Sequence, residues 1–248
     1  MMATTTVARG PAESGTRAKR KAPFLVELYR SALGKKYIMA ITGIMLVGFV
    51  VAHMVGNLKM YLGPTQLDHY GEFLRELLVP ILPRTWTLWI LRIGLIGAFV
   101  LHIHSAFALT RINHAARHVK YQSPRDYIAA NWASRTMRQT GIIFAIFLVW
   151  HLFDLTFTGT GTTFVRGFPY ENLARSLSRV PVALLYIVGN LALGIHLFHG
   201  VWSLFQSLGW NNPRFNLWRR YLAGGIAGIV VIGNVSFPIA VLAGIVHI

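Results

Sequence analysis

The sequence contains no cysteine and only 8 acidic residues among 248. Without cysteine the chain forms neither disulfides nor thiolate-held zinc or iron–sulfur centres, so histidine, carboxylate or methionine must hold any metal that it binds. Charged residues make up 13% of the chain and hydrophobic residues 54%, whereas soluble domains carry about 25% charged residues. A Gly-x-Gly-x-x-Gly dinucleotide fingerprint is also missing. These absences argue against a soluble nucleotide-dependent enzyme and indicate an integral membrane protein.

Five apolar segments have the length of about 20 residues that crosses roughly 30 Å of hydrocarbon. We therefore predict an all-α integral membrane protein with five transmembrane helices in one membrane domain over residues 23–248. Residues 1–22 are polar and basic, and we expect a disordered cytoplasmic tail there. The predicted spans cover residues 37–57, 86–110, 139–157, 182–208 and 221–247.

Shorter elements are expected at the membrane surfaces. Apolar residues recur at helical spacing over residues 24–33 and within the loop 59–84, which predicts two short interfacial helices. The loop 159–181 is rich in glycine, threonine and arginine, and we expect it to cap the outer mouth of the bundle.

Basic residues are distributed unevenly between the two sides of the predicted spans. The net charge is +16, and 17 of the 24 Lys and Arg residues fall on the side that carries the N-terminus, against 7 on the other side. By the positive-inside rule the N-terminus is cytoplasmic and, after five spans, the C-terminus is outside the cell (plasma) membrane. Topology and a docking surface thus explain the charge, and nucleic acid is not needed as a partner.

Each of the first four spans carries a histidine at membrane depth, where an ionisable side chain is costly unless it is paired or binds something. At 1.5 Å per residue, His53 lies roughly 24 Å and His102 roughly 12 Å from the inner membrane surface. His151 and His196 fall near the middle of their spans and lean outward and inward, respectively. The depths therefore predict an outer pair, His53 with His151, and an inner pair, His102 with His196.

Two imidazoles from different helices at matching depth are what bis-histidine haem ligation requires, so we expect four of the spans to form a haem-binding bundle. Glycines such as Gly43, Gly48 and Gly141 would let a flat ring enter, although glycine is also ordinary packing in membrane helices. The structural alternative is that each histidine only hydrogen-bonds a neighbouring helix.

Further histidines and three arginines are secondary candidates. His104 follows His102 by two residues and points to nearly the opposite face of the helix. His199 lies one turn from His196, on the same face, where it would contact a propionate, a quinone or water. The arginines near span ends are candidate propionate partners, or equally snorkelling topology charges; they are Arg92, Arg111 and Arg138.

Three stretches resemble a known family. They are residues 31–43 (SALGKKYIMAITG), 53–61 (HMVGNLKMY) and 196–210 (HLFHGVWSLFQSLGW), the last followed by Asn-Pro-Arg. They resemble the single-chain, five-span cytochrome b anchor subunit of succinate:quinone oxidoreductases, which are succinate dehydrogenases or fumarate reductases. The resemblance covers about residues 33–220 and is most specific in its last segment.

The resemblance implies two haems b, with His53 and His151 as axial ligands of one and His102 and His196 as ligands of the other, nearest the iron–sulfur subunit. His104 stays open as an alternative to His102. It also implies a flavoprotein subunit and an iron–sulfur subunit on the cytoplasmic face, within a complex that can form a higher oligomer. This chain would then carry out no succinate chemistry itself but pass electrons through its haems to a membrane quinone, often menaquinone.

Quinone reduction takes up protons, so an ionisable group is expected beside the quinone. Candidates at the outer side are Tyr61, Asp68, Glu72 and Asp154, and candidates at the inner side are Ser31, Lys35 and Lys36. The sequence does not choose between the sides. Two other functions stay open: a haemless anchor that binds quinone directly against the iron–sulfur partner, and a transporter with a histidine relay.

Overall fold

The computed structural model describes residues 23–116, 130–157, 159–210 and 212–247, so the predicted tail over 1–22 lies outside the described residues. Those residues form helices and no strand, and five of the helices are long and apolar enough to cross a membrane. The predicted fold class is therefore confirmed. The long helices are α2 (Ala32–Asn57), α4 (Trp86–Ala115), α5 (Ala130–Leu152), α7 (Val180–Ser207) and α8 (Asn216–Leu242).

In the described parts of the chain, six short elements precede, connect or extend the long helices. The helix α1 (Phe24–Arg30) precedes α2, and α3 (Pro64–Glu76) occupies the first predicted loop, so both predicted short helices are present. The remaining elements are the 3-10 turn η1 (Leu58–Leu62), the π turn η2 (Phe153–Phe157), the helix α6 (Pro169–Leu177) and the 3-10 turn η3 (Pro213–Phe215).

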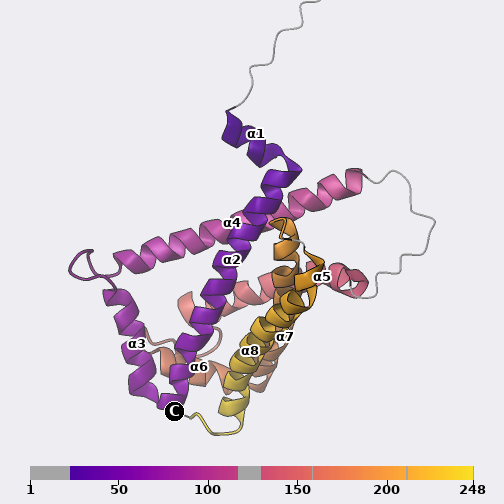
Figure 1. The fold of residues 1–248 in the computed structure, drawn as a ribbon. Helices are drawn as coiled ribbons and strands as arrows, with labels where there is room; N and C mark the ends of the chain where they lie inside the picture. Colours follow the sequence, from indigo (N-terminus) through magenta and orange to yellow (C-terminus); the bar gives the residue numbers. More distant parts are fainter. Residues whose placement is uncertain (1–22, 117–129, 158, 211, 248) are drawn as a thin grey trace, which may run out of the picture.

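The long helices form a bundle with two distinct ends (Figure 1). α2, α7 and α8 run in similar directions, whereas α4 and α5 cross them obliquely in this view. α1 lies at one end, which we name the α1 end, and α3, α6 and the C-terminus gather at the other, which we name the α6 end. α2 therefore runs from the α1 end to the α6 end.

Close approach of α2, α7 and α8 depends on glycine. A Cβ atom at Gly233 of α8 would come 2.4 Å from the sulfur of Met54 on α2. A Cβ atom at Gly194 of α7 would come 2.2 Å from a methyl group of Val231 on α8. Small residues at such crossings are how membrane helices pack closely. Large apolar side chains on the outer faces remain exposed, including Ile93, Ile146 and Ile232, as the lipid-facing side of a bundle requires.

The α6 end is closed by a helix that the sequence did not predict. The loop 159–181 is expected to cap the outer mouth of the bundle, with no helix predicted in it, and it contains α6. The carboxylate of Asp68 on α3 accepts a hydrogen bond from the backbone N–H of Tyr170, at 3.0 Å, in the first turn of α6. A carboxylate at a helix N-terminus satisfies a backbone donor and the helix dipole. Because this acceptor comes from another helix, local sequence in the loop does not show it.

Helix starts also differ from the predicted boundaries. α2 begins at Ala32 rather than at residue 37, because the side chain of Ser31 accepts a hydrogen bond from Gly34 N at 2.9 Å. Lys35 then donates through Nζ to the carbonyl oxygens of Tyr29 and Arg30, at 2.8 and 3.0 Å, and so satisfies the end of α1. The junction between the interfacial helix and the first span is thus fixed by polar side chains.

Candidate functional site

The imidazoles of His102 on α4 and His196 on α7 lie together in the half of the bundle nearer the α1 end. Their ring centres are 6.4 Å apart and their ring planes make an angle of 69°. The two histidines are 94 positions apart in the sequence and come from different spans. The depth argument places them in one pair, and the structure brings them together.

Both of these imidazoles are held through Nδ1. The Nδ1 atom of His102 lies 3.2 Å from Oγ1 of Thr42, and that hydroxyl donates its own proton to the carbonyl oxygen of Ile38 at 2.7 Å. The hydroxyl therefore accepts from His102. The Nδ1 atom of His196 lies 3.2 Å from the carbonyl oxygen of Met137, which can only accept. In a neutral imidazole whose Nδ1 is the donor, Nε2 carries the lone pair that binds a metal.

The second pair, His53 on α2 and His151 on α5, lies nearer the α6 end. The ring centres are 5.9 Å apart and the ring planes are at 89°. His151 also packs against the rings of Phe147 and Tyr186, with centres 6.0 and 5.8 Å away. Its Nδ1 atom is buried and has no hydrogen-bond partner among the residues that the structure describes. Asn57 approaches His53 only at 3.4 Å. Aromatic contacts rather than strong hydrogen bonds therefore surround this pair.

The spacing within each pair can be compared with the spacing that a shared metal requires. A metal–imidazole bond is about 2 Å long and the ring centre lies about 1 Å beyond the nitrogen, so two imidazoles on opposite sides of one metal have centres about 6 Å apart. The observed 6.4 and 5.9 Å agree with this value. Two imidazoles that bind one metal can take any angle between their ring planes, so the angles of 69° and 89° are compatible with a shared metal.

The two pairs lie at well-separated depths. His102 contacts Thr42 on α2, and His53 follows Thr42 on the same helix by 11 residues. At 1.5 Å per residue, this places the two pairs about 16 Å apart along the helix axis. The bundle thus presents two bis-histidine sites, one above the other.

A metal held by protein atoms alone needs more ligands than a pair supplies. The described segments contain no group of three or more His, Cys, Asp or Glu side chains that could hold a metal ion. The macrocycle of a haem supplies four ligands to its iron, so the protein needs to supply only two imidazoles. The donor set of each pair therefore fits haem, with His53, His102, His151 and His196 as the residues that would hold it.

No known family model, curated protein or solved structure detectably matches this chain. The functional assignment therefore depends on the residues and their geometry, and membership of the cytochrome b anchor family stays a proposal.

The secondary histidine candidates have other surroundings. His104 accepts or donates a hydrogen bond at Nδ1 with the hydroxyl of Tyr29, at 2.7 Å, and the two rings stack at 13°. His104 therefore joins α4 to α1 through Tyr29. His199 is buried one turn from His196, and its ring contacts that of Phe198 with centres 5.1 Å apart.

The three candidate arginines contact aromatic rings or a loop-proximal histidine. Arg92 lies over the ring of Trp89, at 5.2 Å, and Arg111 over that of Phe107, at 5.9 Å, each on its own helix. Such contacts suit arginines that extend along a membrane helix toward the interface. Arg138 lies 3.3 Å from Nε2 of His114, which connects α5 to the end of α4.

Asp154, a candidate for the outer quinone site, is enclosed in a polar network. Its carboxylate accepts hydrogen bonds from the hydroxyls of Ser176, Thr160 and Tyr186, the last at 2.9 Å, and Arg179 forms an ion pair with it at 3.1 Å. The Asp154 side chain is completely buried, whereas Arg179 is 29% exposed. This network joins η2 to α6 and α7, so Asp154 has a structural role at the α6 end.

Two further outer candidates also have structural partners. Asp68 caps α6, as described above, and Glu72 pairs with Arg75 at 2.9 Å and with Arg84 in exposed ion pairs. At the α1 end, Ser31 and Lys35 are used at the junction of α1 and α2, and Lys36 is exposed.

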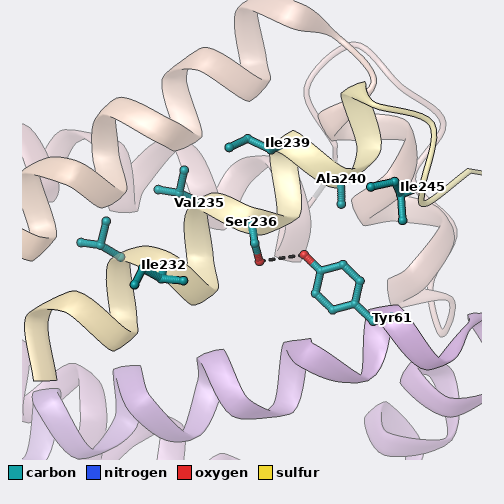
Figure 2. Close-up of a pocket in the computed structure, with 8 residues that line it drawn as sticks. Tyr61, Ile232, Val235, Ser236, Ile239, Ala240 and Ile245 are labelled. Atoms are coloured by element: carbon teal, nitrogen blue, oxygen red, sulfur yellow. Dashed lines mark hydrogen bonds between the residues drawn. The ribbon is translucent and has the colours of Figure 1, made fainter. Parts of the chain in front are cut away.

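Tyr61 differs from these residues because it borders a groove. Its hydroxyl donates to Oγ of Ser236 at 2.7 Å, across a groove of about 480 Å³ between η1 and α8 (Figure 2). Ser236 donates in turn to the carbonyl oxygen of Gly233 at 2.6 Å. The tyrosine and serine hydroxyls provide a polar spot in an otherwise aliphatic wall. The other lining residues are Val231, Ile232, Val235, Ile239, Ala240 and Ile245.

Sequence reasoning missed the residues that hold the first pair of histidines. Thr42 and the carbonyl group of Met137 have no composition or motif that marks them individually. A signal was nevertheless present, because Thr-Gly-Ile occurs at residues 42–44 and again at 140–142, each time with a histidine 11 residues after the threonine.

Proposed function

We propose that this chain is the membrane-anchor cytochrome b subunit of a respiratory succinate:quinone oxidoreductase. The observation that carries the proposal is the pair of bis-histidine sites, with ring centres 6.4 and 5.9 Å apart. The resemblance of residues 31–43, 53–61 and 196–210 to such anchors supports the same function.

In this proposal the chain's residues bind, orient and enclose two b haems. His102 and His196 present Nε2 because their Nδ1 atoms are occupied by Thr42 and Met137. His53 and His151 are kept in place by aromatic neighbours, including Tyr186. When bound, haem supplies one-electron redox chemistry.

The α1 end is proposed to face the cytoplasm and the iron–sulfur and flavoprotein subunits. The support is the excess of Lys and Arg on the side that carries the N-terminus, where 17 of 24 basic residues fall. A basic surface also favours docking of an acidic partner face. The α6 end, with the C-terminus, would then face the outside of a cell membrane.

The quinone is proposed to bind in the groove of Tyr61 and Ser236 at the α6 end, on the side of the His53–His151 pair. Isoprenoid chains are apolar and fit aliphatic walls such as those of Ile232 and Ile239. Tyr61 Oη gives its proton to Ser236, so its lone pairs are open to a quinol hydroxyl. Rotation of the same hydroxyl lets it donate to a quinone carbonyl.

The test is the reduced-minus-oxidised spectrum of the chain purified with its neighbouring subunits. We expect two b-type haems per chain, and we expect His53→Ala and His196→Ala each to remove one while leaving the other. His69→Ala, at an exposed position on α3, is the matched control and keeps both. A complex that assembles but shows no reduced α band would instead be a haemless anchor, and proton or solute flux by the isolated chain would indicate a histidine-relay transporter.

A further inference from the structure

Two of the long helices carry the same short motif at equivalent places. α2 contains Thr42-Gly43-Ile44 and α5 contains Thr140-Gly141-Ile142. In both helices a histidine of the second pair, His53 or His151, follows the threonine by 11 residues. Both threonines are buried, with 5% and 7% of their surface exposed. The two motifs also occupy equivalent positions in the bundle, because each lies against a histidine of the first pair, His102 or His196.

The motif on α2 lies against His102. Thr42 accepts from Nδ1 of His102 while its own hydroxyl donates to Ile38 O at 2.7 Å and, more weakly, to Met39 O at 3.3 Å. Gly43, the next residue, lies close to the same ring, since a Cβ atom there would be 3.5 Å from Cε1 and 3.8 Å from Nδ1 of His102. The threonine thus provides the acceptor, and the glycine provides space beside the ring.

The motif on α5 lies against His196 with one change. Here the acceptor for Nδ1 is the carbonyl oxygen of Met137, and Thr140 donates to that same oxygen at 3.1 Å and to Thr136 O at 2.8 Å. A Cβ atom at Gly141 would be 3.2 Å from Cε1 and 3.3 Å from Nδ1 of His196. The His196 ring thus lies against Gly141, and the Thr140 hydroxyl bonds to the same Met137 oxygen that accepts from the ring.

We propose that Thr42–Gly43 and Thr140–Gly141 are two equivalent cradles that fix the tautomer and ring orientation of His102 and His196. This inference rests on the proposed function, in which the Nε2 atoms of both histidines would bind one haem iron. Threonine and glycine act here as positioning residues and do not touch the metal. Each of α2 and α5 therefore contributes a ligand to one site and a cradle to the other, which ties the two sites to the same pair of rigid helices.

A simpler role for the threonines is the ordinary bond of a helical hydroxyl to the carbonyl four residues earlier. Thr110 on α4 makes that bond, to Ala106 O at 2.8 Å, and serves as the matched control. If back-bonding alone matters, Thr42→Val and Thr110→Val have the same consequences. If the cradle matters, only Thr42→Val changes His102, and Thr42→Ser, which keeps the hydroxyl, restores it.

The first measurement is electron paramagnetic resonance of the oxidised complex, together with its haem content. Loss of a hydrogen bond to an axial histidine typically weakens metal binding by about 10–100-fold. In Thr42→Val we expect the low-spin signal of one haem to broaden and shift, and that haem to be lost first on dilution into haem-free detergent. The other signal stays unchanged, and Thr42→Ser and Thr110→Val match the wild type. Equal behaviour of Thr42→Val and Thr110→Val would overturn the proposal.

The second measurement does not depend on haem. In the full chain in lipid, with ¹⁵N-labelled histidine, we expect two imidazoles locked with the proton on Nδ1, and Thr42→Val to release one of them. Absence of locked Nδ1–H imidazoles contradicts the cradles even if haem is bound. Conversely, locked imidazoles in a complex without b haems would support the two cradles and contradict the proposed function.

Discussion

The completely buried Asp154 provides the sharpest prediction about the stability of the α6 end. Replacing it by alanine removes the acceptor for Ser176, Thr160 and Tyr186 and the partner of Arg179. Breaking a buried ion pair by removing one partner costs about 3–5 kcal/mol. Because Arg179 is 29% exposed and can turn toward water, we expect the lower end of that range. A loss of about 3 kcal/mol is roughly a 150-fold change in the unfolding equilibrium.

The assay, under the proposed function, is unfolding of the purified complex in increasing denaturing detergent, followed by the absorbance of the two proposed haems. We expect Asp154→Ala to release the haem of His53 and His151 at a lower detergent fraction than the wild type. The reason is that Tyr186, which donates to Asp154, also packs against the ring of His151. Glu72→Ala is the control, because it breaks only exposed ion pairs at the same end, worth less than about 1 kcal/mol. The reasoning is wrong if the two variants unfold alike.

Three further predictions concern single sites. Tyr61→Phe should raise the apparent KM for quinone about tenfold, the loss of roughly one hydrogen bond, while the haem spectrum stays unchanged; an unaltered KM would place the quinone elsewhere. Gly141→Ala brings a Cβ atom to 3.2 Å from the His196 ring and should destabilise the His102–His196 site by about 1–3 kcal/mol. Gly228→Ala is the control, because a Cβ atom there meets nothing within 4 Å, and it should leave the site unchanged. Tyr29→Phe removes the hydrogen bond to His104 and should make α1 more sensitive to proteolysis without loss of haem; loss of haem would contradict the role given to His104.

The long spans and the grouping of the four histidines follow from simple features of the chain. A stretch of apolar residues long enough to cross a membrane has few alternatives to a helix, because backbone groups in lipid must bond within the segment. A constant rise per residue then converts sequence position into depth. This is why His53 and His151, or His102 and His196, could be grouped although they lie about 100 positions apart.

Other features depend on contacts between distant segments and could not be predicted. α6 is capped by Asp68 from another helix, so the sequence of its own loop does not show where the helix starts. Asp154 looked like an ionisable group near a site, but partners from α6 and α7 enclose it. Nothing in the linear sequence marks Thr42 as the partner of His102. In each case the side chain's role is set by a neighbour that the linear pattern does not identify.

The account's central claim is that His102 with His196, and His53 with His151, are axial ligands of two haems. The most direct test is the number of b haems per chain in the purified complex, compared between His102→Ala and His104→Ala. We predict two haems in the wild type, one in His102→Ala and two in His104→Ala, because His104 is bonded to Tyr29 instead. Loss of a haem in His104→Ala alone, or a wild-type complex without haem, would contradict the account.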